Sequence, residues 1–184
     1  MKPLTLITIF LLIACQSYPR PIKTVSISPD AEFQLVSPTN FDALSALQKI
    51  SVFWEGHKLS FNVQLENSNG AFHLVGLTPV YSRSFLISYS KGILDFKEHP
   101  YFRYPVNPEN MLADFQMAFA ESQYLVNGSL KLKTSERKRE FHSKSKLVQT
   151  IKYSKEDKWQ SEVNIINHVK GYRLKIKTLQ FEKL

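Results

Sequence analysis

The stretch KLSFNVQL, residues 58–65, carries the clearest structural pattern in this chain. Its second, fourth, sixth and eighth residues are apolar and the others are polar. A period of two is that of a β-strand with one buried and one solvated face. The segment Asn67-Ser68-Asn69-Gly70 follows as a turn, because Asn and Gly tolerate a positive φ. The chain returns as a strand over residues 71–77, so the sequence predicts a β-hairpin.

Similar strands flank this hairpin on both sides. Residues 50–54 precede it and are joined to it at Glu55-Gly56, whereas residues 83–90 and 93–97 follow it and are joined at Lys91-Gly92. The sequence thus predicts a meander of about five antiparallel strands. Before the meander, residues 40–48 suggest a short helix capped by Asn40.

A helix is predicted over residues 108–120, where the period changes. Asn107 is a favourable N-cap, Pro108 suits the first helical position, and Glu109 complements the helix dipole. Apolar residues recur after them at helical spacing and form a wide apolar face. Such a helix is suited to covering the open side of a curved sheet.

Strands resume after the helix. Short alternating runs occupy residues 130–133, 147–153, 159–165 and 172–177. Between them, residues 135–146 are polar and basic, and they suggest a long hairpin tip or a mobile loop. The last strand is apolar on one face and basic on the other, a pattern that also protects a sheet edge.

The N-terminal segment indicates export. Residues 1–14 contain one charge, Lys2, and a short apolar run, which is too short to span a bilayer and suits a secretory signal peptide. The chain's only cysteine, Cys15, follows Leu12-Ile13-Ala14 and resembles the lipobox of bacterial lipoproteins. The resemblance implies cleavage before Cys15 and acylation of that residue. Gln16 in place of Asp then implies sorting to the outer membrane.

These signals divide the chain into three parts. Residues 1–14 form the signal peptide, residues 15–30, rich in proline, form a lipidated tether, and residues 31–184 form a single β domain. The composition, with 43% hydrophobic and 12% aromatic residues, is that of a globular protein and argues against disorder.

Positive charge is concentrated in the last third of the chain. Residues 129–184 contain 15 Lys/Arg and 6 Asp/Glu, which gives +9, whereas residues 15–128 contain 8 and 10. For an exported protein this favours anionic head groups over nucleic acid as partners, although a solvated surface accounts for it equally well. The basic surface that we expect consists of Lys131, Lys133, Arg173, Lys175 and Lys177.

The sequence contains no motif of a known chemistry. There is no nucleophile elbow, P-loop, dinucleotide fingerprint or zinc-protease motif, and the five histidines are too far apart for local metal ligation. We therefore expect no metal, no cofactor and no enzymatic activity. Asp114 and His99 are the best candidates for a catalytic pair assembled by the fold.

One resemblance to a family extends over about residues 44–179. The segments 74–79, Arg83-Ser84-Phe85 and 108–118 resemble proteobacterial outer-membrane lipoproteins of unassigned function, often encoded near aryl-polyene or fatty-acid-synthesis-like genes. That family is similar to the LolA/LolB lipoprotein carriers. The resemblance implies a mainly β (α+β) fold: an unclosed, strongly curved antiparallel β-barrel with a helical lid that holds acyl chains.

Three hypotheses follow for the function. The first is a monomeric module on the periplasmic face of the outer membrane that binds or transfers an acyl lipid, a lipoprotein or an aryl-polyene-type lipid. The second is an adaptor lipoprotein of an envelope biosynthesis complex with no ligand, and the third an acyl hydrolase or transferase. For the first, the residues expected to line a cavity, unless they form a filled core, are Phe61, Val63, Phe72, Leu74, Phe85, Ile87, Met111, Leu112, Phe115 and Phe119.

Overall fold

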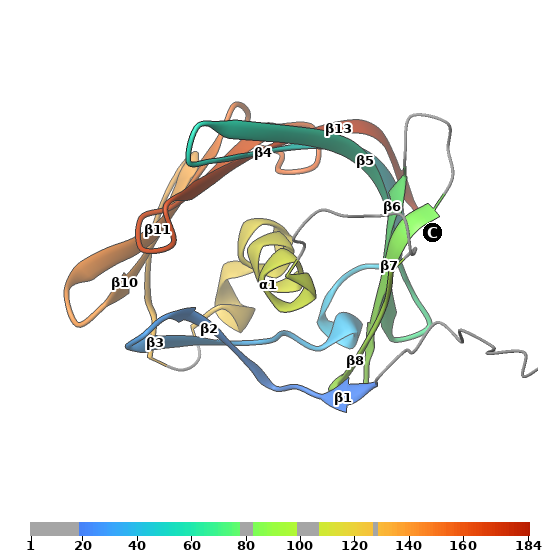
Figure 1. Cartoon of the computed structure of the whole chain (residues 1–184), viewed down its shortest axis with the longest axis horizontal. Coiled ribbons are helices and arrows are strands. Elements are labelled where there is room, and N and C mark those ends of the chain that lie inside the picture. Colours follow the sequence, from blue (N-terminus) through green and yellow to red (C-terminus); the bar gives the residue numbers. More distant parts are fainter. Residues whose placement is uncertain (1–18, 78–82, 99–106, 127–128) are drawn as a thin grey trace, which may run out of the picture.

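The computed structural model describes residues 19–77, 83–98, 107–126 and 129–184. This part of the chain is mostly β-structure with one α-helix (Figure 1). The elements are β1 (Arg20–Pro21), β2 (Thr24–Ser28), β3 (Ala31–Gln34), η1 (Pro38–Asn40), β4 (Leu44–Trp54), β5 (His57–Ser68), β6 (Ala71–Leu77), β7 (Arg83–Ser90), β8 (Ile93–Glu98), α1 (Pro108–Phe119), η2 (Ser122–Tyr124), β9 (Lys131–Ser135), β10 (Lys138–Ser143), β11 (Lys146–Tyr153), β12 (Glu162–Asn167) and β13 (Tyr172–Lys183).

The strands form one large antiparallel sheet that curves without closing. Among the described strands the order is β1-β8-β7-β6-β5-β4-β13-β12-β11-β10-β9, so β1 and β9 are its two edges. The hairpin β2–β3 lies apart from this sheet and covers the side between the two edges (Figure 1). Helix α1 lies on the concave side, between the sheet and the hairpin. The predicted fold class, an unclosed and strongly curved antiparallel barrel with a helix, is confirmed.

Tight turns set the register of the predicted meander. The turn Asn69-Gly70 has φ values of 51° and 72°, and it joins β5 to β6 as predicted. Glu55-Gly56 and Lys91-Gly92 have the same pattern of positive φ at both positions. Two-residue turns of this kind match the right-handed twist of the strands that they connect. The apolar residues that alternate in 58–65 therefore lie on the same face of the sheet as the apolar residues of the neighbouring strands.

Two predictions about the first fifty residues differ from the structure. Residues 44–48 are the start of β4 rather than a helix, because β5 and β13 pair with this strand on either side. Residues 20–30, predicted as tether, form β1 and β2, and in β2 both Val25 and Ile27 are only 1% exposed. In both places burial against neighbouring elements outweighs the local helix or coil preference of the sequence. Residues 1–18 lie outside the described part.

The predicted basic loop of residues 135–146 is also a strand in its centre. Phe141 and Ser143 of β10 face inward, where each is at most 5% exposed, and the charged or polar residues Lys138, Glu140 and His142 face outward. The alternation is obscured in the sequence because one inward residue is Arg139, which is 4% exposed. The neighbouring prediction for residues 159–165 is correct only from Glu162, where β12 begins.

Helix α1 begins as predicted. The side chain of Asn107 accepts a hydrogen bond from the backbone N–H of Asn110 at 2.9 Å, and Pro108 is the first helical residue. In the last turn of the helix, the Gln116 side chain forms a pair of hydrogen bonds with the backbone of Val36: Val36 N–H donates to Gln116 Oε1 at 2.8 Å, and Gln116 Nε2 donates to Val36 O at 2.9 Å. This pair fixes α1 to the segment that follows β3.

The C-terminal end of α1 is held by side chains from the sheet. Nη1 of Arg139 donates to the carbonyl oxygens of Met117 and Ala118 at 2.9 and 3.1 Å, and the Tyr153 hydroxyl donates to Ala118 O at 2.7 Å. Lys158 Nζ lies 3.3 Å from the carbonyl oxygen of Ala120. These donors satisfy carbonyl groups that have no partner within the helix, and the two cations complement the negative end of its dipole.

We predict that Arg139→Met lowers the free energy of unfolding by about 2–4 kcal/mol, because it leaves the Met117 carbonyl without its donor and removes one of the two donors to the Ala118 carbonyl. Arg137→Met is the matched control, since Arg137 is exposed in the preceding turn, and we expect it to change stability by less than about 0.5 kcal/mol. Urea unfolding followed by circular dichroism measures both. Equal effects of the two substitutions would show that the contacts of Arg139 with the helix contribute nothing.

Candidate functional site

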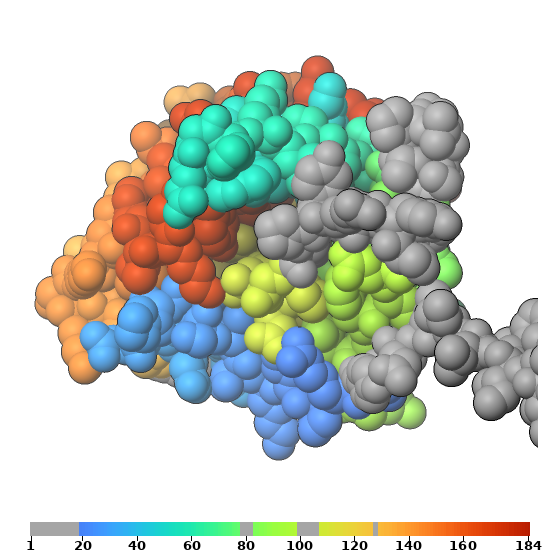
Figure 2. All heavy atoms as spheres, viewed as in Figure 1, coloured from blue at the N-terminus to red at the C-terminus, as the bar shows by residue number. Residues whose placement is uncertain are grey.

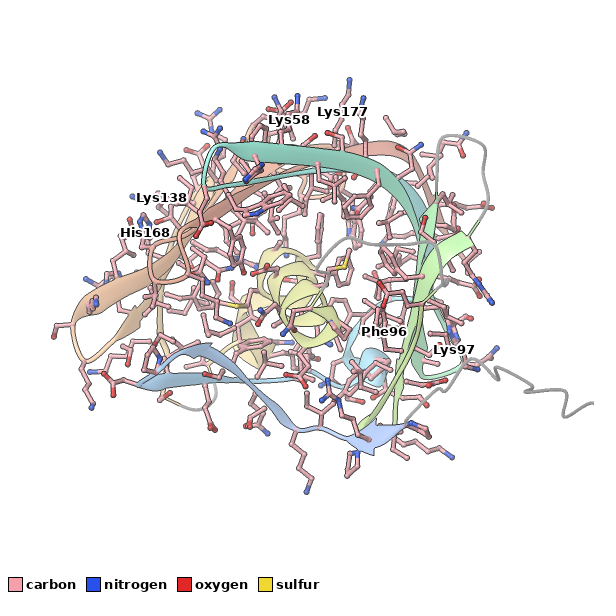
Figure 3. All side chains as sticks on the ribbon, viewed as in Figure 1. Lys58, Phe96, Lys97, Lys138, His168 and Lys177 are labelled. Atoms are coloured by element: carbon pink, nitrogen blue, oxygen red, sulfur yellow. The ribbon has the colours of Figure 1, made fainter. Side chains whose placement is uncertain are left out.

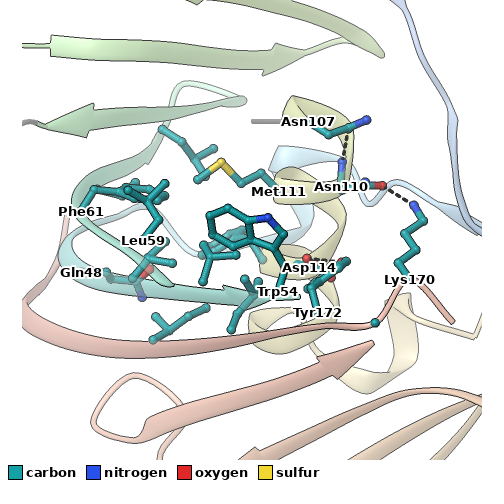
Figure 4. Close-up of a pocket in the computed structure, with 18 of the residues that line it drawn as sticks. Gln48, Trp54, Leu59, Phe61, Asn107, Asn110, Met111, Asp114, Lys170 and Tyr172 are labelled. Carbon is teal, nitrogen blue, oxygen red and sulfur yellow. Dashed lines mark hydrogen bonds between the residues drawn. The ribbon is translucent and has the colours of Figure 1, made fainter. Parts of the chain in front are cut away.

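The concave side of the sheet contains a cavity of about 300 Å³ beside α1. Its walls are the inner faces of β4, β5 and β13, with contributions from β6 and from the first half of the helix (Figure 4). The apolar residues that line it are Ile50, Val52, Trp54, Leu59, Phe61, Val63, Leu74, Met111, Phe115, Leu174 and Ile176. The polar or charged ones are Gln48, Glu55, Asn107, Asn110, Asp114, Lys170 and Tyr172.

Strand alternation produces this lining. Ile50, Val52 and Trp54 are every second residue of β4, and Tyr172, Leu174 and Ile176 are every second residue of β13. The two strands pair so that Ile50 lies opposite Ile176 and Trp54 opposite Tyr172. Side chains of one parity therefore form one continuous apolar wall, while those of the other parity point to the convex side.

The structure places five of the ten predicted cavity residues on this lining. Phe61, Val63 and Leu74 reach it from β5 and β6, and Met111 and Phe115 reach it from α1. The other five are buried, at most 3% exposed, but do not border the cavity: Phe72, Phe85, Ile87, Leu112 and Phe119.

Aromatic packing explains why those residues belong to a filled core. The ring of Phe72 meets Phe41 edge-on at 4.6 Å and Phe115 at 5.7 Å between centroids. Phe119 stacks on Trp159 at 4.4 Å. Helix α1 thus fills one part of the concave space with rings and leaves the part beside β4 and β13 open. The interior is partly filled core and partly cavity.

The predicted cavity residues include none from β4 or β13. The alternation of Tyr172, Leu174 and Ile176 is plain in the sequence and identified the apolar face of β13. What it does not reveal is that β13, the last strand, pairs with β4, the first strand of the meander. That pairing joins residues more than a hundred positions apart and brings the two apolar faces together.

A polar cluster lies at one end of the cavity, centred on Asp114 of α1, which is 3% exposed. Its Oδ2 accepts a hydrogen bond from the Tyr172 hydroxyl at 2.7 Å (Figure 4). Its Oδ1 accepts a second one from Gln149 Nε2 at 3.0 Å. Burial raises the pKa of Asp114 from its usual 3.8 to about 6, against the opposing effects of these two donors and of the charge on Lys170.

Lys170 is the member of the polar cluster that lies at the surface. Its Nζ donates to Asn110 Oδ1 at 2.8 Å and to the carbonyl oxygen of Ser26 at 2.7 Å. It therefore links the turn between β12 and β13 to both α1 and β2. In the space-filling view, α1 (yellow) reaches the surface between the red C-terminal strands and the blue N-terminal segment (Figure 2).

No catalytic or metal site is apparent in the described residues. Asp114 has Tyr172 and Gln149 as partners rather than a histidine, and His99, the other candidate, lies outside the described ranges. In the part of the chain that the structure describes, no three His, Cys, Asp or Glu side chains are grouped for a metal ion. Within the same residues, no helix is long and apolar enough to cross a membrane.

The predicted basic residues all lie on the convex side of the sheet. Arg173, Lys175 and Lys177 are the exposed residues of β13 that alternate with the cavity wall, and Lys131 and Lys133 are exposed on the edge strand β9. Lys58, Lys138 and Lys177 point away from the helix on this side (Figure 3). Lys175 forms an ion pair with Glu162 at 2.9 Å, and the lysine lowers the pKa of that carboxyl.

Comparison with known proteins identifies the family of this chain. The fold is an unclosed antiparallel sheet wrapped around one helix, and the chain belongs to the family described as a protein of unknown function (DUF3261), whose model matches residues 45–180. This range agrees with the 44–179 over which the sequence showed a family resemblance. Among curated proteins, none matches the chain in sequence.

Solved structures with a similar arrangement share little sequence with this chain. One is a LolA superfamily protein from Nitrosomonas europaea, with a TM-score of 0.48, 11% identity, and coverage of 78% of this chain and 86% of that one. Another is a putative outer membrane lipoprotein-sorting protein domain from Vibrio parahaemolyticus, with a TM-score of 0.43, 9% identity, and coverage of 77% and 85%. At these identities the likeness concerns the fold alone.

We predict that Asp114→Asn stabilises the protein at neutral pH and has little effect near pH 4. The pKa of Asp114 is higher in the folded state than in the unfolded chain, so its contribution to stability is present below about pH 4 and is lost as the pH rises through 6. We expect the gain at pH 7.5 to be on the order of 2 kcal/mol.

Urea unfolding at pH 4 and pH 7.5 measures this difference. Asp42→Asn is the control, because Asp42 is exposed and pairs only with exposed Lys183, at 3.0 Å. We expect that substitution to change stability by less than about 1 kcal/mol at either pH. An equal gain from Asp114→Asn at both pH values would contradict the assignment of the gain to ionisation.

Proposed function

We propose that this protein binds an acyl chain in the cavity between α1 and the β4–β5–β13 wall, and that it serves as a lipid- or lipoprotein-binding module rather than an enzyme. One observation supports this above all: the cavity stays open inside a core that is elsewhere filled by aromatic rings. Its walls are formed mainly by aliphatic and aromatic side chains. Transfer of an acyl chain from water to such walls is favourable, at about 0.8 kcal/mol for each buried methylene group.

The size of the cavity favours one acyl chain as its content. A volume of about 300 Å³ is at the lower end of the range for small-molecule pockets, about 300–1,000 Å³. The wall of alternating side chains runs along neighbouring strands, and this shape suits an extended chain. A diacyl or triacyl ligand then leaves its other chains outside this cavity.

The N-terminal sequence supports anchoring of this module to a membrane. We propose that Cys15 is lipidated and that the protein faces the periplasm from the outer membrane. Because the first described strand begins at Arg20, four residues of the sequence lie between Cys15 and that strand. The basic convex side, with Arg173 and Lys177 among its residues, is suited to anionic head groups in that membrane.

We predict that the full chain carrying Cys15→Ser, which lacks the acylated residue, binds a fluorescent fatty-acid analogue with one bound molecule per chain. Leu59→Trp fills the cavity and is expected to lower the affinity at least about tenfold. Ser60→Trp is the matched control, because Ser60 is the next residue of β5 and points to the convex side. We expect it to leave the affinity unchanged.

Native mass spectrometry of the same chain, isolated from a bacterial envelope fraction, adds an independent observation. A mass excess that fragments to an acyl lipid supports the proposal and identifies the ligand. A chain that is empty and takes up no offered fatty acid would contradict it, and would favour an adaptor that acts only through protein partners.

Lipidation of Cys15 has a separate test. Cells that express the wild-type chain and are fed labelled palmitate should incorporate label into the protein, and Cys15→Ala should abolish that incorporation. Ser17→Ala, two residues further along the chain, is expected to keep it. Label retained in Cys15→Ala would show that acylation, if present, occurs at another residue.

A further inference from the structure

A second, more open groove lies on the other side of the rim that bounds the cavity. Trp54, Glu55, Gly171 and Tyr172 border both the cavity and this groove. The residues that border only the outer groove include Phe53, His57, Lys58, Ile166, His168 and Arg173. The rim consists of the β4–β5 turn and the end of the β12–β13 turn, so the two hollows meet at one end of the barrel.

Strand pairing determines which side chains lie on each side of the rim. Trp54 is opposite Tyr172 in the β4–β13 pair, and both line the cavity. The neighbouring residues Phe53 and Arg173 are also opposite each other, and they border only the groove. In the β4–β5 pair, Phe53 is opposite Lys58. Neighbouring residues of the same strand therefore place one side chain in the apolar interior and the next on the cationic exterior.

The two cations of the groove are available to a ligand. The guanidinium carbon of Arg173 lies 4.7 Å from the centre of the Phe53 ring, and Lys58 Nζ lies 5.6 Å from it. Among the described residues, neither cation forms an ion pair with a carboxylate, in contrast to Lys175 beside Glu162. Glu55 is the one acidic residue of the described groove lining, on its edge with the cavity.

Among the residues that the structure describes, the interior lining offers no comparable place for negative charge. Asp114 is the buried charged group at the polar end of the cavity, and its carboxylate disfavours a second anion nearby. Lys170, the cation at this end, already donates to Asn110 and to the backbone of Ser26. A negatively charged head group is therefore more stable outside the rim than inside it.

We infer that the ligand of the cavity is an anionic amphiphile, whose acyl chain lies inside while its phosphate or carboxylate head crosses the rim and binds Arg173 and Lys58 in the outer groove. This inference rests on the proposed function. The guanidinium of Arg173 suits either head group, because its planar set of donors matches two oxygens at once. Lys58 adds a second positive charge from β5, the strand on the other side of β4.

The test compares single-chain amphiphiles of one length on the full chain carrying Cys15→Ser, below their micelle concentrations. Dodecyl phosphate and dodecanoate carry the anion, and dodecanol is the neutral counterpart. Each displaces a fluorescent fatty-acid analogue from the cavity. We expect the two anions to bind at least about tenfold more tightly than dodecanol at low salt, with the difference shrinking as salt is added.

Variants locate the head group. Arg173→Gln and Lys58→Gln should each weaken dodecyl phosphate severalfold and leave dodecanol unchanged, whereas Glu55→Gln should strengthen dodecyl phosphate. Lys177→Gln is the matched control: Lys177 lies on the same face of β13 but does not border the groove, and its replacement should change neither affinity. Thermal unfolding verifies that each variant is folded.

The possible outcomes separate this inference from the proposed function. Equal binding of dodecanol and dodecyl phosphate would overturn the inference and leave acyl binding intact. A preference for anions that Lys177→Gln reduces as much as Arg173→Gln would also overturn it, since the whole convex face would then be responsible. Displacement of the probe by inorganic phosphate alone would indicate a site for free anions. Failure of every amphiphile to bind would contradict the proposed function itself.

Discussion

The position of α1 inside the curved sheet depends on the buried guanidinium of Arg139. A helix that packs against a concave sheet buries its own C-terminal carbonyl groups, and each one without a partner costs about 1–3 kcal/mol. Arg139 and the Tyr153 hydroxyl supply donors to the carbonyl groups of Met117 and Ala118. In the same last turn, the Gln116 side chain forms two hydrogen bonds with the backbone of Val36. The helix is thus fixed by directional polar contacts as well as by apolar packing.

The fixed helix explains why the interior is only partly filled. Apolar packing alone would move the helix until the empty volume disappeared, because voids cost packing energy. The polar contacts oppose that movement, since a shift of α1 toward β4 and β13 lengthens its hydrogen bonds with Arg139 and with the backbone of Val36. Aromatic rings then fill the region that the helix does reach, as the contacts of Phe72 with Phe115 illustrate. The cavity is the volume that remains.

The sequence predicted local features well and long-range pairing poorly. The hairpin after residues 58–65 and the start of α1 at Asn107 follow from periodicity and capping, which involve residues close together in the chain. Residues 20–30 and 44–48 were misassigned because their strands are stabilised by distant partners. Arg139 obscured β10, since a cation at an inward position breaks the expected pattern. Half of the predicted cavity residues belong instead to the filled core, because which side of the helix stays open depends on tertiary contacts that no local pattern records.

The arrangement at the rim shows how one sheet serves two chemical environments. In an antiparallel sheet the change from one face to the other takes a single residue, so an apolar wall and a charged face can follow each other along the same strand. Where β4 ends and β13 begins, no further sheet separates the two faces, and Tyr172 and Arg173 lie on either side of the boundary. The charged groups on the two sides of this boundary have opposite signs. Asp114 makes the interior end unfavourable for an anion, whereas Arg173 and Lys58 make the exterior favourable. An amphiphile with a negative head therefore has one favourable orientation at this end of the cavity, with its chain inward, and it leaves by the same path without moving a charge through the core.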